Sequence, residues 1–194
     1  MGWGRSVHSN PTRVLFVCTG NLHRSPMAQT ILSDLLAERG IRAEIASAGL
    51  LPGGQPMPLE TQEALRALGH DGPELGAQRS HQVTDSDVTS ADLVVGMARN
   101  HVREVVVRMP ETWDKTFTLK ELVRRGLAVE ARRADEELRS WLGRVADDRD
   151  RQDLLGSATV DDVADPIGGS SSMFEQTANE IQRLCVSLST LLWP

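Results

Sequence analysis

The stretch VLFVCTGNLHRSP, residues 14–26, joins a short apolar run to a turn of small and polar residues and then to a proline. Four consecutive apolar residues are typical of a strand buried on both faces, and the Gly-Asn pair marks a turn. Pro26 suits the first turn of a helix, and the helical pattern continues to Arg39 before Gly40 ends it. The segment therefore predicts a strand, a tight loop and a helix in immediate succession.

Apolar runs and helical patterns keep alternating along the rest of the chain. Strands are expected at 41–47, 92–97 and 115–118, and helices at 59–68, 99–109, 119–125, 130–146 and 172–192. This alternation predicts an α/β fold of three layers, with a four-stranded parallel sheet and helices on both faces. We expect residues 1–12 to form a flexible N-terminal tail and residues 13–194 a single domain with a helical insertion near 119–160.

The composition excludes several classes of protein. The chain has 194 residues, of which 40% are hydrophobic and 25% charged, as expected for one globular domain with a real core. Acidic residues outnumber basic ones by 27 to 21, which argues against a nucleic-acid or membrane surface as partner. No signal peptide or spanning segment is evident, so a cytoplasmic location is predicted. The two cysteines and five histidines lack metal-ligand spacing, so no metal or other cofactor is expected.

Cys18 ends the first strand, and Arg24 follows six residues later, just before the helix. Loop amides and a helix N-terminus can bind an anion such as phosphate, and a guanidinium matches two phosphate oxygens. The same field favours a thiolate, so Cys18 is expected to be nucleophilic at neutral pH. The predicted phosphate-binding loop contains, besides these two residues, Thr19, Gly20, Asn21, Leu22, His23 and Ser25.

The loop resembles that of the low-molecular-weight protein tyrosine phosphatase family, whose pattern is V-C-x-G-N-x-x-R-S-P. Three further segments are similar to the family: Ser47-Ala-Gly49, residues 79–84 (RSHQVT) and Asp165-Pro166. The resemblance implies the low-molecular-weight phosphatase fold and a metal-free phosphomonoesterase that acts through a cysteinyl-phosphate intermediate. It also implies a loop held by hydrogen bonds among Asn21, Ser47 and His81.

In this chemistry Cys18 attacks phosphorus while Arg24 stabilises the equatorial oxygens, and an acid protonates the leaving oxygen. Asp165 is the expected acid, because Pro166 stiffens its loop and two glycines follow. Asp161 and Asp162 are the rival candidates in this acidic region.

The cysteine content sets an expectation for oxidation. Many family members carry a second cysteine in the loop, where this chain has His23. Cys185 lies on the apolar stripe of the last helix and is expected in the core. Cys18 therefore lacks a partner for a protective disulfide, and ready over-oxidation is predicted. His23 either tunes the thiolate or has no catalytic part.

The substrate class is a separate question. An aliphatic Leu22 suits packing against a flat ring, whereas relatives that hydrolyse phosphoarginine tend to have a small polar residue there. The chain has no tyrosine, and Ile167 stands where many relatives place one. The predicted substrate is a phosphotyrosine protein or a small aryl or alkyl phosphate. A small-molecule phosphatase of a biosynthetic pathway, an arsenate reductase and a silent phosphate-binding module remain as alternatives.

Overall fold

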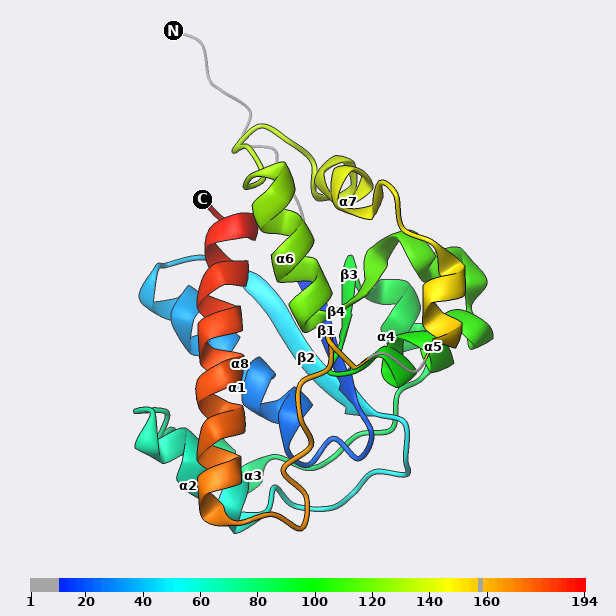
Figure 1. The fold of residues 1–194 in the computed structure, drawn as a ribbon. Coiled ribbons are helices and arrows are strands. Elements are labelled where there is room, and N and C mark those ends of the chain that lie inside the picture. Colours follow the sequence, from blue (N-terminus) through cyan, green and yellow to red (C-terminus); the bar gives the residue numbers. More distant parts are fainter. Residues whose placement is uncertain (1–10, 157–158) are drawn as a thin grey trace, which may run out of the picture.

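The computed structural model describes residues 11–156 and 159–194 (Figure 1). Its strands are β1 (Thr12–Cys18), β2 (Ala43–Gly49), β3 (Leu93–Gly96) and β4 (Thr116–Thr118). Its α-helices are α1 (Arg24–Glu38), α2 (Leu59–Ala67), α3 (Glu74–Ala77), α4 (Asp85–Ser90), α5 (Arg99–Arg108), α6 (Leu119–Val129), α7 (Leu138–Ala146) and α8 (Ser171–Leu192), and two 3-10 helices span Pro110–Lys115 and Arg151–Leu155. The expected N-terminal tail lies outside the described residues up to residue 10, and β1 already begins at Thr12.

The four strands form one parallel sheet in the order β2-β1-β3-β4, which confirms the predicted α/β architecture. The last residue of β1, Cys18, is paired with Gly49, the last residue of β2. On the other side of β1, Val17 is paired with Gly96, the last residue of β3. Parallel strands present their carboxyl ends at a common edge of the sheet, so the loops after β1, β2 and β3 meet there.

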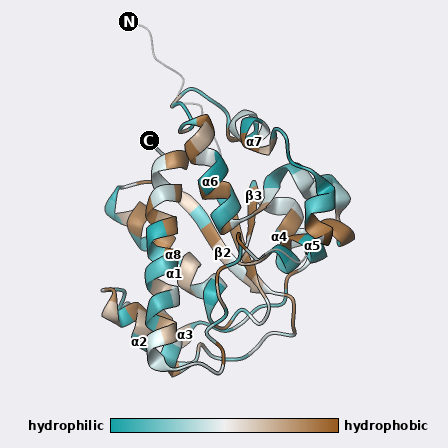
Figure 2. Ribbon diagram, viewed as in Figure 1, coloured by the Kyte–Doolittle hydropathy of each residue, from teal (hydrophilic) through white to brown (hydrophobic). Residues whose placement is uncertain are grey.

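Helices cover both faces of the sheet because alternate residues of β1 point to opposite sides. Val14 and Phe16 belong to the core formed with α1, α6 and α8, whereas Leu15 and Val17 pack with residues of α4 and α5. In Figure 2 the long helix α8 carries bands of both colours, as expected of an element with one buried and one solvated face. No helix in the described part of the chain, α8 included, is both long and apolar enough to cross a membrane.

The segment after α6 differs from the sequence prediction. The helix expected at 130–146 begins only at Leu138, and α6 instead continues to Val129. Glu130 adopts a φ of 67°, a left-handed conformation that ends α6. Arg132 then donates from its backbone N–H and its Nε to the carbonyls of Leu191 and Leu192 at the end of α8. These tertiary hydrogen bonds override the helix propensity of the segment.

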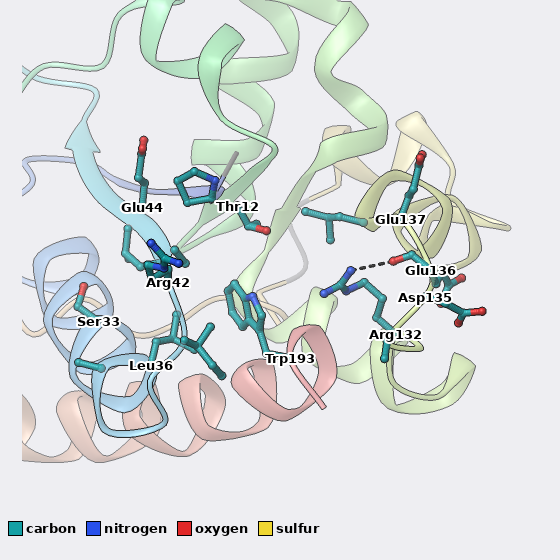
Figure 3. A pocket seen from close by; sticks show the side chains of 17 residues that line it. Thr12, Ser33, Leu36, Arg42, Glu44, Arg132, Asp135, Glu136, Glu137 and Trp193 are labelled. Carbon is teal, nitrogen blue, oxygen red and sulfur yellow. Dashed lines mark hydrogen bonds between the residues drawn. The ribbon is translucent and has the colours of Figure 1, made fainter. Parts of the chain in front are cut away.

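A groove of about 1250 Å³ opens at the end of the sheet where β1 and β2 begin (Figure 3). Thr12, Ala43 and Trp193 are among the residues that line the groove. The structure describes all of residues 18–25, and none of them lines it. A strand of this length spans roughly 20 Å, so the groove is remote from the Cys18 loop. The Cys18 loop lies at the opposite edge of the sheet, where the strands end.

Candidate active site

The loop between β1 and α1 is clamped against the end of β2. Asn21 adopts a φ of 52°, a left-handed conformation that asparagine tolerates better than most residues. A Cβ on Gly49 would lie 2.7 Å from the Asn21 nitrogen, so only glycine fits beneath the loop. The backbone N–H groups of Leu50 and Leu51 donate to the carbonyls of Cys18 and Thr19, at 3.1 and 2.9 Å. The chain after β2 thus continues the sheet pairing along the loop.

Cys18 lies at the base of this loop, with only 3% of its surface exposed. Its Sγ accepts hydrogen bonds from the Ser25 hydroxyl at 3.0 Å and from the Asn21 backbone N–H at 3.2 Å. The loop leads directly into the 15-residue helix α1, whose N-terminus carries a partial positive charge. Two hydrogen-bond donors and the positive end of the helix dipole therefore converge on the Cys18 sulfur.

Three of the predicted supporting residues hold the loop, although not all through their side chains. The Asn21 Nδ2 donates to Ser47 Oγ at 2.8 Å and to Ser25 Oγ at 3.0 Å. The Asn21 Oδ1 accepts from the backbone N–H of His81 at 2.8 Å. The imidazole of His81 turns away and contacts Asp87 at 2.8 Å. His81 therefore joins the network through its backbone N–H and not through its imidazole. The sequence-based expectation named the residue without saying which of these two groups takes part.

Arg24 is buried at the start of α1 and points toward the segment before α8. Its Nη1 donates to the Val163 carbonyl at 3.1 Å, and its Nη2 lies 2.5 Å from Asp165 Oδ2. The same Nη2 lies 3.4 Å from Thr19 Oγ1. The guanidinium is therefore fixed by three groups at the mouth of the loop, and one of these is the predicted acid.

The three candidate acids occupy distinct environments. Asp165 is partly exposed, and its Oδ1 accepts from the Ile167 backbone N–H at 3.2 Å, which forms a tight local turn. Asp161 is paired with Arg124 at 2.8 Å. Asp162 accepts from the Arg99 backbone N–H at the start of α5. Among the three, Asp165 contacts the arginine of the loop, whereas the other two support neighbouring elements.

His23 points from the loop toward α2 and α8. Its Nδ1 lies 2.6 Å from Thr61 Oγ1, and its ring meets Phe174 edge-on at a centroid distance of 5.2 Å. Burial is the main cause that lowers the pKa of His23, partly offset by the nearby Asp165. These contacts anchor the loop to α2 and α8, so the role of His23 is structural.

Three apolar side chains belong to the loop or to segments next to it. Leu51 and Ile167 are exposed and Leu22 is half-buried. Leu51 adjoins the loop through its hydrogen bond to Thr19, and Ile167 adjoins Asp165. The nearby Gly53 permits close packing against the segment before His81, because a Cβ there would lie 2.4 Å from the Ser80 carbonyl oxygen.

Sequence reasoning missed one polar residue of the site. His101, in the first turn of α5, is fully buried, and its Nε2 lies 3.0 Å from Thr19 Oγ1. No motif marks it, and it is separated from Thr19 by 82 positions. The available signal was its place shortly after β3, whose carboxyl end shares an edge with that of β1.

Comparisons with known proteins point to a single family. A sequence model of the low molecular weight phosphotyrosine protein phosphatase family matches residues 13–140. The chain is 30% identical to a protein-arginine-phosphatase of Geobacillus stearothermophilus, over 94% of this chain and 97% of that protein. It is 29% identical to one of Bacillus subtilis (strain 168), over 92% and 95%. A crystal structure of a low molecular weight protein tyrosine phosphatase from T. tengcongensis superposes with a TM-score of 0.68 at 33% identity, covering 91% of this chain and 97% of that one.

Proposed function

This chain belongs to the low molecular weight phosphotyrosine protein phosphatase family, and from that premise we propose the roles of its residues and its substrate. It is a cysteine-dependent phosphatase. In our proposal Cys18 is the nucleophile, Arg24 binds the phosphoryl group and Asp165 is the general acid. The observation that carries the proposal is the direct contact between Arg24 and Asp165 at the mouth of the Cys18 loop.

Hydrolysis proceeds in two steps. The Cys18 thiolate forms a bond to phosphorus as the bond to the leaving oxygen breaks, and Asp165 gives that oxygen a proton. Arg24 and the loop amides stabilise the negative charge on the three remaining oxygens. Water then attacks phosphorus, Asp165 takes its proton and the Cys18 sulfur leaves as thiolate. The Ser25 hydroxyl, 3.0 Å from Sγ, stabilises that leaving thiolate.

We propose phosphotyrosine in proteins as the substrate, since Leu22, Leu51 and Ile167 offer apolar surface to an aromatic ring. Phosphoarginine is the second candidate, because two relatives that match more than 90% of the chain are protein-arginine-phosphatases. We propose the cytoplasm as its location, because the cytosol keeps thiols such as that of Cys18 reduced.

The acid is tested with a series of aryl phosphates whose leaving phenols differ in acidity. Asp165→Asn should slow the substrates with poor leaving groups by roughly 10²- to 10⁴-fold and those with good leaving groups far less. Asp162→Asn is the matched control, because it alters a carboxylate three positions away that caps α5. A steep dependence on the leaving group in the control, or a uniform loss in Asp165→Asn, would contradict the assignment.

The substrate class is tested by comparing kcat/KM for phosphotyrosine peptides, phosphoarginine, arsenate and sugar phosphates. We expect phosphotyrosine to be preferred, and Leu22→Thr to shift the ratio toward phosphoarginine. A wild-type preference for phosphoarginine would overturn the proposed substrate and leave the chemistry intact. Cys18→Ser is the blank, since it should abolish turnover of every phosphate ester.

A further inference from the structure

Thr19 joins two side chains that come from different parts of the fold. It follows the nucleophile directly, and its Oγ1 lies 3.4 Å from Arg24 Nη2 and 3.0 Å from His101 Nε2. Arg24 comes from the start of α1 and His101 from the first turn of α5. The arginine that binds phosphate is therefore connected through one hydroxyl to a helix on the other face of the sheet.

The hydrogen bonds around His101 favour one tautomer. Arg24 can only donate, so Thr19 Oγ1 accepts from it, whereas His101 Nε2 can donate or accept. The other ring nitrogen, Nδ1, is buried and has no hydrogen-bond partner among the described residues. A buried N–H without a partner costs more than an unused lone pair. The proton therefore belongs on Nε2, which then donates to Thr19.

The surroundings of His101 also keep it uncharged. Burial, with a smaller contribution from the positive charge of Arg24, lowers the pKa of His101 to about 3. An imidazolium here would face the arginine through a single intervening hydroxyl. A neutral ring with a fixed proton is suited to holding a neighbour and unsuited to acid–base exchange near neutral pH.

We propose that His101 is a positioning residue of this phosphatase: its Nε2–H donates to Thr19 Oγ1, and the Thr19 oxygen in turn holds the Arg24 guanidinium in the orientation that receives the phosphoryl oxygens. This inference rests on the proposed role of Arg24. It gives His101 an effect on anion binding although the imidazole does not touch the substrate.

A structural histidine elsewhere in the chain provides the contrast. His70 is also buried, and its Nδ1 lies 2.5 Å from Asp34 Oδ2, in the last turns of α1 and away from the loop at its start. Its Nε2, like the Nδ1 of His101, has no partner among the described residues. The two histidines are therefore both buried, but His101 contacts Thr19 of the Cys18 loop and His70 contacts Asp34 of α1.

The test compares His101→Leu, His101→Gln, Thr19→Val and His70→Leu by the inhibition constant of inorganic phosphate, kcat/KM for an aryl phosphate and the melting temperature. Loss of one hydrogen bond predicts a phosphate inhibition constant about 3- to 10-fold higher in His101→Leu and in Thr19→Val. The double variant His101→Leu/Thr19→Val should bind phosphate no more weakly than either single variant, because both substitutions act through the Thr19 hydroxyl oxygen. His101→Gln retains an N–H donor and should recover part of the loss. His70→Leu should lower the melting temperature without changing the phosphate constant.

The proposal is overturned if His101→Leu binds phosphate like the wild type, or if its loss adds to that of Thr19→Val. A measurement on the unmodified enzyme guards against variants that do not fold. In ¹⁵N NMR spectra, His101 should carry its proton on Nε2 between about pH 5 and 8, and a proton on Nδ1 contradicts the proposal. If the wild type hydrolyses no phosphate ester, the proposed function fails, while the NMR result still decides the hydrogen bond of His101.

Discussion

Asn21 combines a left-handed backbone conformation with three side-chain hydrogen bonds, and replacing it separates the two contributions. Asn21→Ala removes the hydrogen bonds to Ser25, Ser47 and the His81 backbone N–H and places a Cβ residue at a φ of 52°. Asn21→Gly removes the same hydrogen bonds, but glycine adopts this conformation without strain. The pair of variants therefore measures the network and the strain independently.

The structure gives a magnitude for each variant. Asn21 is buried, so each lost hydrogen bond costs about 1 kcal/mol of the free energy of unfolding, and three cost about 3 kcal/mol. The left-handed conformation adds about 1 kcal/mol for alanine. We expect Asn21→Gly to be destabilised by about 3 kcal/mol and Asn21→Ala by about 4 kcal/mol. Both should lower kcat/KM, because the backbone N–H of Asn21, which the side-chain hydrogen bonds hold in place, donates to the Cys18 sulfur.

Urea unfolding followed by fluorescence gives the free energies, and hydrolysis of an aryl phosphate gives the activities. Asn179→Ala is the matched control: this asparagine is exposed on α8, and its loss should change stability by less than about 0.5 kcal/mol. If Asn21→Gly is as stable and as active as the wild type, the side-chain network does not hold the loop. If the two variants are equally destabilised, the conformational argument is wrong.

Two further predictions concern other parts of the chain. The buried guanidinium of Arg149 lies over the rings of Trp113 and Phe117, 3.7 and 4.0 Å from their centroids, and also binds Glu121. Lysine lacks a planar group that can stack in this way, so Arg149→Lys should lower the free energy of unfolding by about 2 kcal/mol. Urea unfolding of Arg151→Lys is the comparison, since Arg151 lies 5.8 Å from the Trp113 centroid and should matter little. Excess hydrogen peroxide should convert Cys18 to the sulfinic and sulfonic acids, with activity that dithiothreitol does not restore. No disulfide with Cys185 is expected, because Cys185 is fully buried against α1 and burial raises the pKa of its thiol. A Cys18–Cys185 disulfide found by mass spectrometry would contradict the prediction.

The sequence predicted the elements whose apolar pattern is local. The run at 14–17 lies within β1, and the stripe on the last helix agrees with the buried residues of α8, Cys185 among them. The prediction was wrong at 130–137, where residues with good helix propensity lie outside any helix. The cause is distant in the chain: Arg132 caps the carbonyls at the end of α8, and Trp141 Nε1 donates to the Glu130 carbonyl. Such hydrogen bonds leave no periodic signal in the sequence.

Residue types within the candidate site were predictable where one motif contains them. Cys18, Arg24 and Ser25 lie within eight positions, and the strand–loop–helix pattern brings them together. The sequence could not show which group of His81 contacts the loop. A histidine directs attention to its imidazole, whereas the loop is held by the His81 backbone N–H. The sequence favoured Asp165 among three aspartates because of the proline and glycines that follow it. It could not show the contact with Arg24, which depends on the path of the segment before α8.

The order of the strands explains why His101 was missed and Ser47 was not. β1 lies between β2 and β3, so the Cys18 loop is flanked on one side by residues that follow β2 and on the other by residues that follow β3. The resemblance to a family supplied the β2 side, where Ser47 and Gly49 belong to a short recognisable segment. The β3 side carries no such segment, and the sequence alone does not state that β3 is the second neighbour of β1. Once that order is known, the first turn of α5 is the expected source of contacts to Thr19, because Val17 pairs with Gly96 and both chains leave the sheet at the same edge. Polar residues of that turn should therefore affect phosphate binding even when they share no motif with the loop.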